Sequence, residues 1–81
     1  MKILILFLWF SSGFLLAQNP EMWSRKADKL YRDSNFLEAE EMYRKVNGIK
    51  PYFDQQFNIG NSLYQQGRLD EAKSAYEKSL G

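Results

Sequence analysis

Apolar residues recur three and four positions apart along most of the chain, and polar residues fill the positions between them. The first clear segment carries Trp23, Ala27, Leu30 and Tyr31, and three later segments follow the same spacing. Because about 3.6 residues make one turn of an α-helix, this spacing gathers the apolar side chains on one helical face. A half-buried strand would alternate instead. The pattern predicts an all-α fold.

Polar turn residues separate these segments. Asp-Ser-Asn at residues 33–35 and Gln-Gly-Arg at residues 66–68 each interrupt a helical pattern, and Asn-Gly at residues 47–48 with Pro51 ends another. Such residues favour turns, and a proline opposes continuation of the helix before it. Short loops make each pair of helices an antiparallel hairpin. The predicted helices are Pro20 to Arg32, Phe36 to Val46, Tyr52 to Gln65, and Leu69 to Leu80.

The two hairpins are copies of one pattern. An offset of about 33 residues, a period typical of helical solenoids, matches small residues with small ones and aromatic residues with aromatic ones. Ala27 falls on Gly60, and Tyr43 falls on Tyr76. Small residues let two helix backbones approach closely, and the tyrosines fill the space beside them. The other matched pairs are Leu30 with Leu63, Tyr31 with Tyr64, Phe36 with Leu69, and Ala39 with Ala72.

At these residues the chain resembles a tetratricopeptide repeat (TPR) protein. The family's pattern runs Trp, Leu-Gly, Tyr, Gly-x-Tyr-x-x-Ala, an aromatic residue, Ala and Pro, and the second copy follows it closely from Asn58 to Ala72 and at Tyr76. Lys26 and Ser34 depart from it in the first copy, and the second copy stops before a closing proline. The resemblance implies two TPR hairpins in an α–α superhelix, with repeat 1 at residues 18–51 and an incomplete repeat 2 at residues 52–81.

The first residues have the order of a secretory signal peptide. Met1 and Lys2 give a positive start, an apolar run follows, and small Ala17 precedes polar Gln18. A retained signal anchor is the alternative, but the apolar stretch 3–17 reaches only about 22 Å, short of a hydrocarbon core of about 30 Å. We expect residues 1–17 to be a signal-peptide helix and the rest to be exported to the periplasm or cell envelope.

Composition narrows the possible chemistry. The chain has no cysteine and no histidine, and 11 basic residues nearly balance 10 acidic ones. This excludes a thiolate nucleophile, a Ser/His/Asp triad and a zinc site of sulfur or imidazole, and it provides no long-range attraction for nucleic acid. We expect no enzyme activity, no cofactor and no metal site. The carboxylates of Glu38, Glu40 and Glu41 are expected to favour the helix dipole and stay hydrated.

In this family the first helices of successive hairpins line a concave groove that receives an extended peptide or a partner helix. Asparagine amides can pair with a partner's backbone, and aromatic rings add apolar area, although aromatic stripes on helices often belong to the core instead. Ser24 and Asp28 replace a lysine and an asparagine that a carboxylate clamp would need. The partner-binding groove implied by the resemblance consists of Asp28, Tyr31, Arg32, Asp54, Phe57, Asn58, Asn61, Tyr64 and Gln65.

These observations predict an exported protein-interaction module or scaffold of the bacterial cell envelope. The helix from Phe57 to Tyr64, with the leader, is similar to TPR proteins of bacterial aerotolerance operons, which implies a membrane-bound von Willebrand A domain protein as a partner. Two alternatives stay open: the N-terminal part of a longer solenoid whose function lies in other repeats, and a small carboxylate-based enzyme. The final helix needs an apolar neighbour for Leu69, Ala72, Ala75, Tyr76 and Leu80, which predicts marginal stability or self-association.

Overall fold

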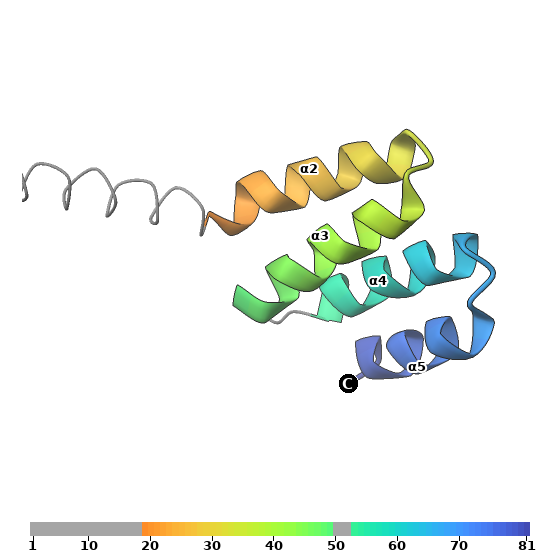
Figure 1. Cartoon of the computed structure of the whole chain (residues 1–81). Helices are drawn as coiled ribbons and strands as arrows, with labels where there is room; N and C mark the ends of the chain where they lie inside the picture. Colours follow the sequence, from red (N-terminus) through yellow and green to blue (C-terminus); the bar gives the residue numbers. More distant parts are fainter. Residues whose placement is uncertain (1–18, 50–52) are drawn as a thin grey trace, which may run out of the picture.

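The computed structural model describes residues 19–49 and 53–81. In these two ranges the chain forms four helices in two antiparallel hairpins (Figure 1). Hairpin 1 consists of α2 (Pro20–Arg32) and α3 (Phe36–Ile49), and hairpin 2 consists of α4 (Phe53–Gln65) and α5 (Leu69–Ser79). The predicted all-α architecture is confirmed. The predicted signal peptide lies outside the described residues, and no helix within them is long and apolar enough to cross a membrane.

Helix boundaries largely follow the local sequence signals. Asn19 caps α2, because its side chain accepts hydrogen bonds from the backbone N–H groups of Glu21 and Met22 at 3.0 and 3.3 Å. The predicted end of the second helix at Val46 is wrong, since α3 continues through Asn47 and Gly48 to Ile49. A glycine inside a helix costs only about 1 kcal/mol relative to alanine, which neighbouring helical residues can offset. The other ends lie within one residue of the prediction.

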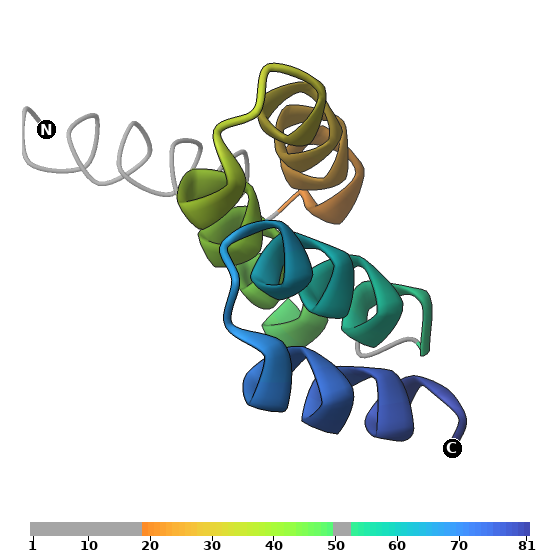
Figure 2. The ribbon, with the colours of Figure 1, turned by 90° about the vertical axis from the view of Figure 1, so that its right-hand side faces the viewer.

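The turns of the two hairpins have the same backbone geometry and lie at the same end of the molecule (Figures 1 and 2). Ser34 and Gly67 both adopt the left-handed conformation, with φ of 64° and 76°. The next residue closes each turn, because the N–H of Asn35 donates to the Leu30 carbonyl at 2.8 Å and that of Arg68 donates to the Leu63 carbonyl at 3.0 Å. The internal repeat therefore extends to the turns.

A continuous core runs through both hairpins. Its buried residues are Ala27, Ala39, Tyr43, Ile59, Leu63, Ala72 and Ala75. Gly60 allows a close approach between the helices of hairpin 2, because a Cβ added there would lie 2.7 Å from ring atoms of Tyr76. The ring of Tyr76 therefore packs directly on the backbone of α4, in agreement with the expectation that tyrosines fill the space beside the small residues.

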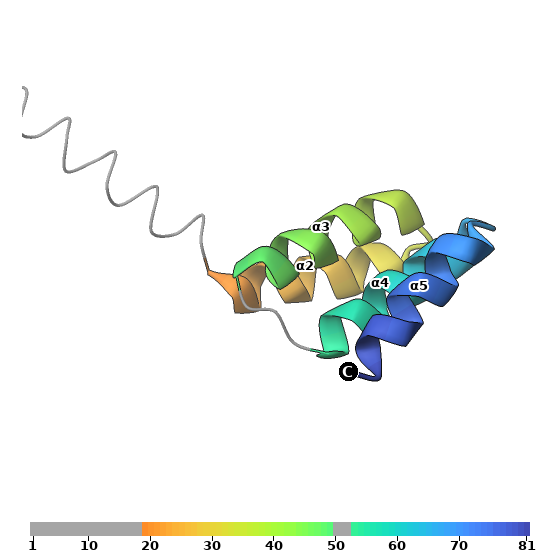
Figure 3. The same cartoon turned by 90° about the horizontal axis from the view of Figure 1, so that it is seen from below.

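The hairpins join through α3 and α4, which pack against each other. A comparison of equivalent positions in α2 and α4, the first helix of each hairpin, shows the effect of this contact. Gln55, Ile59 and Ser62 of α4 are buried, whereas their counterparts on α2 are exposed. Those counterparts are Met22, Lys26 and Lys29. The helices thus follow one another in a series, with α2 at one end and α5 at the other (Figure 1). Seen from below, hairpin 2 lies beside hairpin 1 (Figure 3).

Candidate partner-binding face

The predicted groove residues lie on the first helix of each hairpin. Asp28 and Arg32 on α2 are exposed, and so are Phe57, Tyr64 and Gln65 on α4. The remaining described members are half-buried, and the side chain of Asp54 lies outside the described residues. Below, the candidate face means the eight described residues Asp28, Tyr31, Arg32, Phe57, Asn58, Asn61, Tyr64 and Gln65.

The aromatic members of the candidate face differ in burial. Phe57 and Tyr64 expose 52% and 57% of their surface, so about half of each residue is open to solvent. Tyr31 instead packs against the core and meets Phe36 edge-on, with ring centroids 5.2 Å apart. Phe57 keeps one ring neighbour, Tyr76, at 5.8 Å. The core interpretation therefore holds for Tyr31, while Phe57 and Tyr64 offer apolar area at the surface.

A tyrosine from the second helix holds one polar side chain of the candidate face in each hairpin. The Tyr43 hydroxyl donates to Oδ1 of Asp28 at 2.6 Å, and the Tyr76 hydroxyl donates to Oδ1 of Asn61 at 2.7 Å. Both donors and both acceptors are equivalent in the internal repeat. Because the hydroxyl occupies an oxygen of Asn61, the amide nitrogen keeps its two donors for other groups. The face thus carries a positioned acceptor on α2 and a positioned amide on α4.

Both tyrosine hydroxyls stay protonated at neutral pH. Burial raises the pKa of Tyr43 well above its usual range, and the bond to Asp28 raises it further. Burial also raises the pKa of Tyr76, with smaller contributions from the nearby phenols of Tyr31 and Tyr64. A protonated hydroxyl is the form that can donate to a carboxylate or an amide oxygen. The two bonds therefore persist across the physiological pH range.

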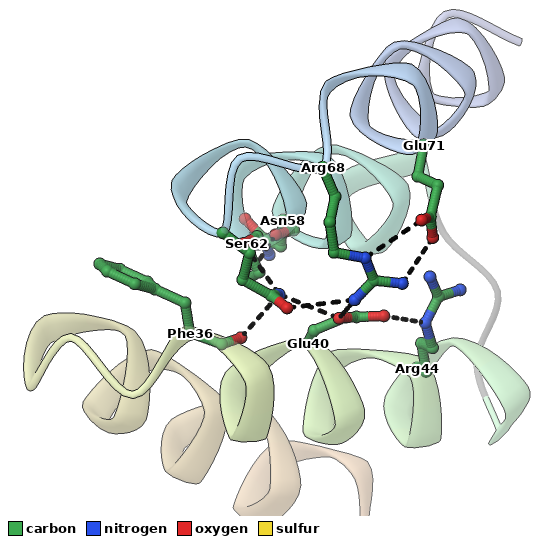
Figure 4. A network of polar contacts seen from close by, with 8 residues as sticks. Phe36, Glu40, Arg44, Asn58, Ser62, Arg68 and Glu71 are labelled. Atoms are coloured by element: carbon green, nitrogen blue, oxygen red, sulfur yellow. Dashed lines mark hydrogen bonds and ion pairs between the residues drawn. The ribbon is translucent and has the colours of Figure 1, made fainter.

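The expectation that Glu40 stays hydrated is wrong. Its side chain is buried, and it accepts hydrogen bonds from Nε of Arg44 at 2.8 Å, Nη1 of Arg68 at 2.7 Å and Nε2 of Gln66 at 3.0 Å (Figure 4). Burial alone raises the pKa of this carboxyl, but the bonds from Gln66 and Arg44 and the charges of Arg44 and Arg68 lower it below its ordinary value. Glu40 is therefore an ionised anchor between the hairpins.

Two of the partners of Glu40, Gln66 and Arg68, come from the turn of hairpin 2, which lies over α3. Arg68 reaches both Glu40 and Glu71, and Gln66 also donates to the carbonyls of Phe36 at 3.4 Å and Ser62 at 3.0 Å (Figure 4). Sequence reasoning treated residues 66–68 only as a turn. The one feature of the sequence that could have indicated an ion pair of Glu40 is its four-residue spacing from Arg44, which suits a pair within one helix. The contact with Arg68 depends on how the hairpins stack.

None of this polar chemistry resembles a metal centre. The described ranges contain no group of three or more His, Cys, Asp or Glu residues that could hold a metal ion. The described members of the predicted acidic cluster are also divided, since Glu40 faces hairpin 2 while Glu38 and Glu41 are exposed. The arrangement on the candidate face combines open aromatic surface with fixed hydrogen-bonding groups, which suits contact with another macromolecule.

Comparison with known proteins agrees with this architecture. Residues 53–80 match the family model of the tetratricopeptide repeat. Hairpin 2 is therefore similar to a tetratricopeptide repeat. The matched segment coincides with hairpin 2, where the resemblance in the sequence is closest, and hairpin 1 shares its turn geometry and its tyrosine hydrogen bond with that TPR hairpin.

One relative extends the likeness beyond hairpin 2. The chain is 41% identical over 49 residues to Protein POLLENLESS 3-LIKE 2 from Arabidopsis thaliana. The alignment covers 60% of this chain but 11% of that protein. The chain therefore spans about a tenth of the relative's length.

Proposed function

We propose that this protein is a non-enzymatic TPR interaction module that binds a partner protein along the candidate face. TPR hairpins mediate contacts between proteins. The observation that carries the proposal is the exposure of Phe57 and Tyr64 beside Asp28 and Asn61, two polar groups held in place by tyrosine hydroxyls. Aromatic side chains next to oriented polar groups supply much of the binding energy at protein interfaces. The ligand is an extended peptide or a helix that crosses α2 and α4.

The setting that we propose is the bacterial cell envelope. The positive, apolar and small-residue order of residues 1–17 supports export with cleavage before Gln18, and a retained anchor is the other outcome. The likeness of the helix from Phe57 to Tyr64 to TPR proteins of aerotolerance operons supports a membrane-bound von Willebrand A domain protein as the partner. N-terminal sequencing of the envelope form tests the first point, because an intact chain confined to the cytosol would contradict export.

A second candidate function is that of one segment in a longer TPR solenoid whose activity lies in other repeats. The observation that favours it is the small share of the Arabidopsis protein that the chain spans. Solenoids normally need about three repeats for stability. A binding experiment can distinguish the two candidate functions, because only the interaction module binds its partner through residues of hairpins 1 and 2 alone.

The decisive experiment tests whether a partner depends on the exposed aromatics. The tagged full-length chain is purified from the organism that makes it, and bound proteins are identified by mass spectrometry. We expect the double variant Phe57→Ala/Tyr64→Ala to lose the bound partner at least about tenfold, since hot-spot aromatics contribute about 2 kcal/mol or more each. The matched control Met22→Ala/Leu37→Ala removes two exposed apolar side chains elsewhere and should keep the partner. Equal retention by both variants would refute the proposal.

A further inference from the structure

A small cavity opens where hairpin 2 meets α3. It has a volume of about 190 Å³ and lies between Arg44 of α3, Gln56 of α4, and Ser74 and Lys78 of α5. We call this cavity the Lys78 pocket. It shares no lining residue with the candidate face, so it is a separate feature of the surface.

The internal repeat explains why hairpin 2 is hollow at this position. The counterpart of Gln56 in hairpin 1 is Trp23, which is half-buried. The ammonium group of Lys45 lies 4.7 Å from the centroid of the Trp23 ring. Lys78 is the counterpart of Lys45, but it lines the pocket beside a smaller amide side chain. Hairpin 1 therefore fills with an indole ring a position that hairpin 2 leaves open.

The buried part of the pocket lining is apolar. Leu63 and Ala75 both line the pocket, and they are only 1% and 5% exposed. Alanine also stands here where hairpin 1 has the larger Met42, which adds to the space. A ligand that enters the pocket therefore meets aliphatic surface at its inner end.

The part of α5 that lines the pocket corresponds to a part of α3 that stays exposed after a hairpin stacks on it. Glu38, Glu41 and Lys45 of α3 are exposed although α4 packs against α3. Their counterparts on α5 line the pocket, and these are Glu71, Ser74 and Lys78. Another hairpin stacked on α5 in the same way would therefore leave the pocket accessible.

The walls of the pocket offer hydrogen-bond donors and positive charge. Nε of Arg44 donates to Glu40, and Figure 4 shows the two terminal nitrogens of Arg44 outside that contact. In the described ranges the ammonium group of Lys78 has no ion pair and no hydrogen bond. Ser74 and Gln56 add a hydroxyl and an amide that can also donate. The pocket thus combines four donor side chains, of which two are cations.

The charge balance at the pocket suits a monovalent anion. Glu71 also lines the pocket, and Arg68 neutralises it with hydrogen bonds from Nε and Nη2. The carboxylates of Glu71 and Glu40 therefore stand against three cations, which leaves one positive charge. The cations are Arg44, Arg68 and Lys78. A carboxylate carries one negative charge at neutral pH, whereas a phosphate group carries about 1.5 to 2. The carboxylate is the better match.

We propose that the Lys78 pocket binds an aliphatic carboxylate. Arg44 and Lys78 hold the carboxylate oxygens, because a guanidinium group and an ammonium group both donate charge-assisted hydrogen bonds to carboxylates. Leu63 and Ala75 contact the aliphatic stem. The source of the carboxylate is a free small acid or a glutamate side chain of a partner protein, since both present this chemistry. The site acts independently of the candidate face and goes beyond the function proposed above.

The test is a titration of the ¹⁵N-labelled full chain, followed by NMR at pH 7 and constant ionic strength in a mild non-ionic detergent. With sodium butyrate we expect saturable shifts of the backbone amides of Ser74, Ala75 and Lys78. The dissociation constant should be on the order of 10 mM, because so small a ligand offers little binding energy. 1-Butanol has a similar stem without the charge and should give no saturable shift. Absence of saturation with butyrate, or tighter binding of inorganic phosphate, overturns the proposal.

A second carboxylate probe distinguishes the two sources. N-acetylglutamate N-methylamide presents the same carboxylate and stem on a peptide backbone. If it binds as tightly as butyrate, a partner's glutamate side chain is supported as the source. If butyrate binds and the capped glutamate does not, a free acid is supported.

Matched variants locate the site. Lys78→Gln should weaken butyrate binding about threefold, as expected for loss of one exposed ion pair. Lys45→Gln removes the same charge from the equivalent exposed position of hairpin 1 and should leave butyrate binding unchanged. Equal weakening by the two variants overturns the proposal, because the effect would then reflect net charge alone. Both positions are exposed, so this pair does not depend on a change in the core.

A pocket-filling variant tests the cavity itself. Gln56→Trp places in hairpin 2 the indole that Trp23 provides in hairpin 1. It should abolish the saturable butyrate shifts while the helical circular dichroism signal is kept. Undiminished butyrate binding by a folded Gln56→Trp variant overturns the proposal, since the ligand would then bind outside the pocket.

Discussion

Hairpins 1 and 2 share a backbone plan but differ in the outward face of their first helix. Hairpin 1 exposes Lys26 and Lys29 on α2, whereas hairpin 2 buries Ile59 and Ser62 at the same positions of α4. The turns and the tyrosine hydrogen bonds are the same in both. The difference shows that a few positions on the first helix, those that face the preceding hairpin or solvent, depend on the place of the hairpin in the series. The internal structure of the hairpin does not change with that place.

The same comparison separates the two ends of the described series. The outer face of α2 is polar at Lys26 and Lys29, as a terminal helix of a solenoid needs to be for solubility. The outer face of α5 instead exposes Leu69 and Leu80. In the described residues one end therefore carries a polar surface, and the other exposes two leucine side chains.

The largest expected effect on stability comes from exchanging residues between equivalent positions of α2 and α4, the first helices of the two hairpins. Ile59→Lys should destabilise the fold by about 4 kcal/mol or more, because it removes a buried side chain and places an ammonium group against α3. For a chain of this size such a loss abolishes the cooperative unfolding transition. Circular dichroism of the full chain on heating measures it.

The control for this exchange is the reverse change at the equivalent position. Lys26→Ile should leave the free energy of unfolding within about 0.5 kcal/mol, because Lys26 is exposed and surface changes have small effects. If Lys26→Ile destabilised the chain as strongly as Ile59→Lys, α2 would not be a solvated end, and the comparison between the hairpins would fail.

The next effect concerns Glu40 and its counterpart Lys73. Glu40→Gln should lower the free energy of unfolding by about 2 kcal/mol at pH 7, because it removes the charge that Arg44 and Arg68 contact in a buried setting. Lys73→Gln should change it by less than about 0.5 kcal/mol. Urea unfolding of both variants beside the native chain gives the two values.

The pH dependence of Glu40 adds a second measurement. Because the folded-state pKa of Glu40 is lowered, its ionised form stabilises the fold above the unfolded pKa of about 4.3. This contribution is lost as the pH falls through the folded pKa. The difference between the native chain and Glu40→Gln should therefore be complete at pH 7 and shrink below about pH 4. A difference that grew on acidification would contradict the assigned direction.

Much of the fold was accessible from the sequence, because local patterns determine it. The periodicity of apolar residues and the turn residues at 33–35 and 66–68 located the helices to within one residue at nearly every end. The internal repeat also predicted that tyrosines fill the space beside small residues, and the packing of Tyr76 on Gly60 agrees with this. The end of α3 was missed, because the tendency of Asn47 and Gly48 to break a helix is weak compared with the helical residues around them.

The polar contacts were accessible only in part, because they depend on distant segments. The four-residue spacing of Glu40 and Arg44 is compatible with a pair within one helix, but the role of Arg68 follows from the stacking of hairpin 2 on α3. Spacing likewise placed Asp28 and Asn61 on one face, yet it carried no information that tyrosines of the second helices hold them. Whether a partner uses that face remains the prediction that the capture experiment tests.

A smaller effect distinguishes the tyrosine hydrogen bonds of the two hairpins. Tyr43→Phe should lower the free energy of unfolding by about 1.5 kcal/mol, because the hydroxyl donates to a carboxylate from a buried position. Tyr76→Phe should cost about 1 kcal/mol or less, since its acceptor is a neutral amide and the ring is only half-buried. Equal losses in chemical unfolding would mean that the charge of Asp28 adds nothing to the bond.

The smallest expected effect on stability comes from the turns. There the two hairpins have different residues, Ser34 and Gly67, in the same backbone conformation. Ser34 and Gly67 both have positive φ, a region in which a side chain is unfavourable and glycine is not. Ser34→Gly should therefore stabilise the chain by about 0.5 kcal/mol after the greater entropy of unfolded glycine is counted, and Gly67→Ser should destabilise it by a similar amount. A Cβ at Gly67 meets no atom within 4 Å, so a larger loss there could not come from a steric clash with neighbours. Opposite signs for the two changes would establish that backbone conformation alone accounts for the difference, whereas destabilisation by both would show that the Ser34 side chain contributes to its own turn.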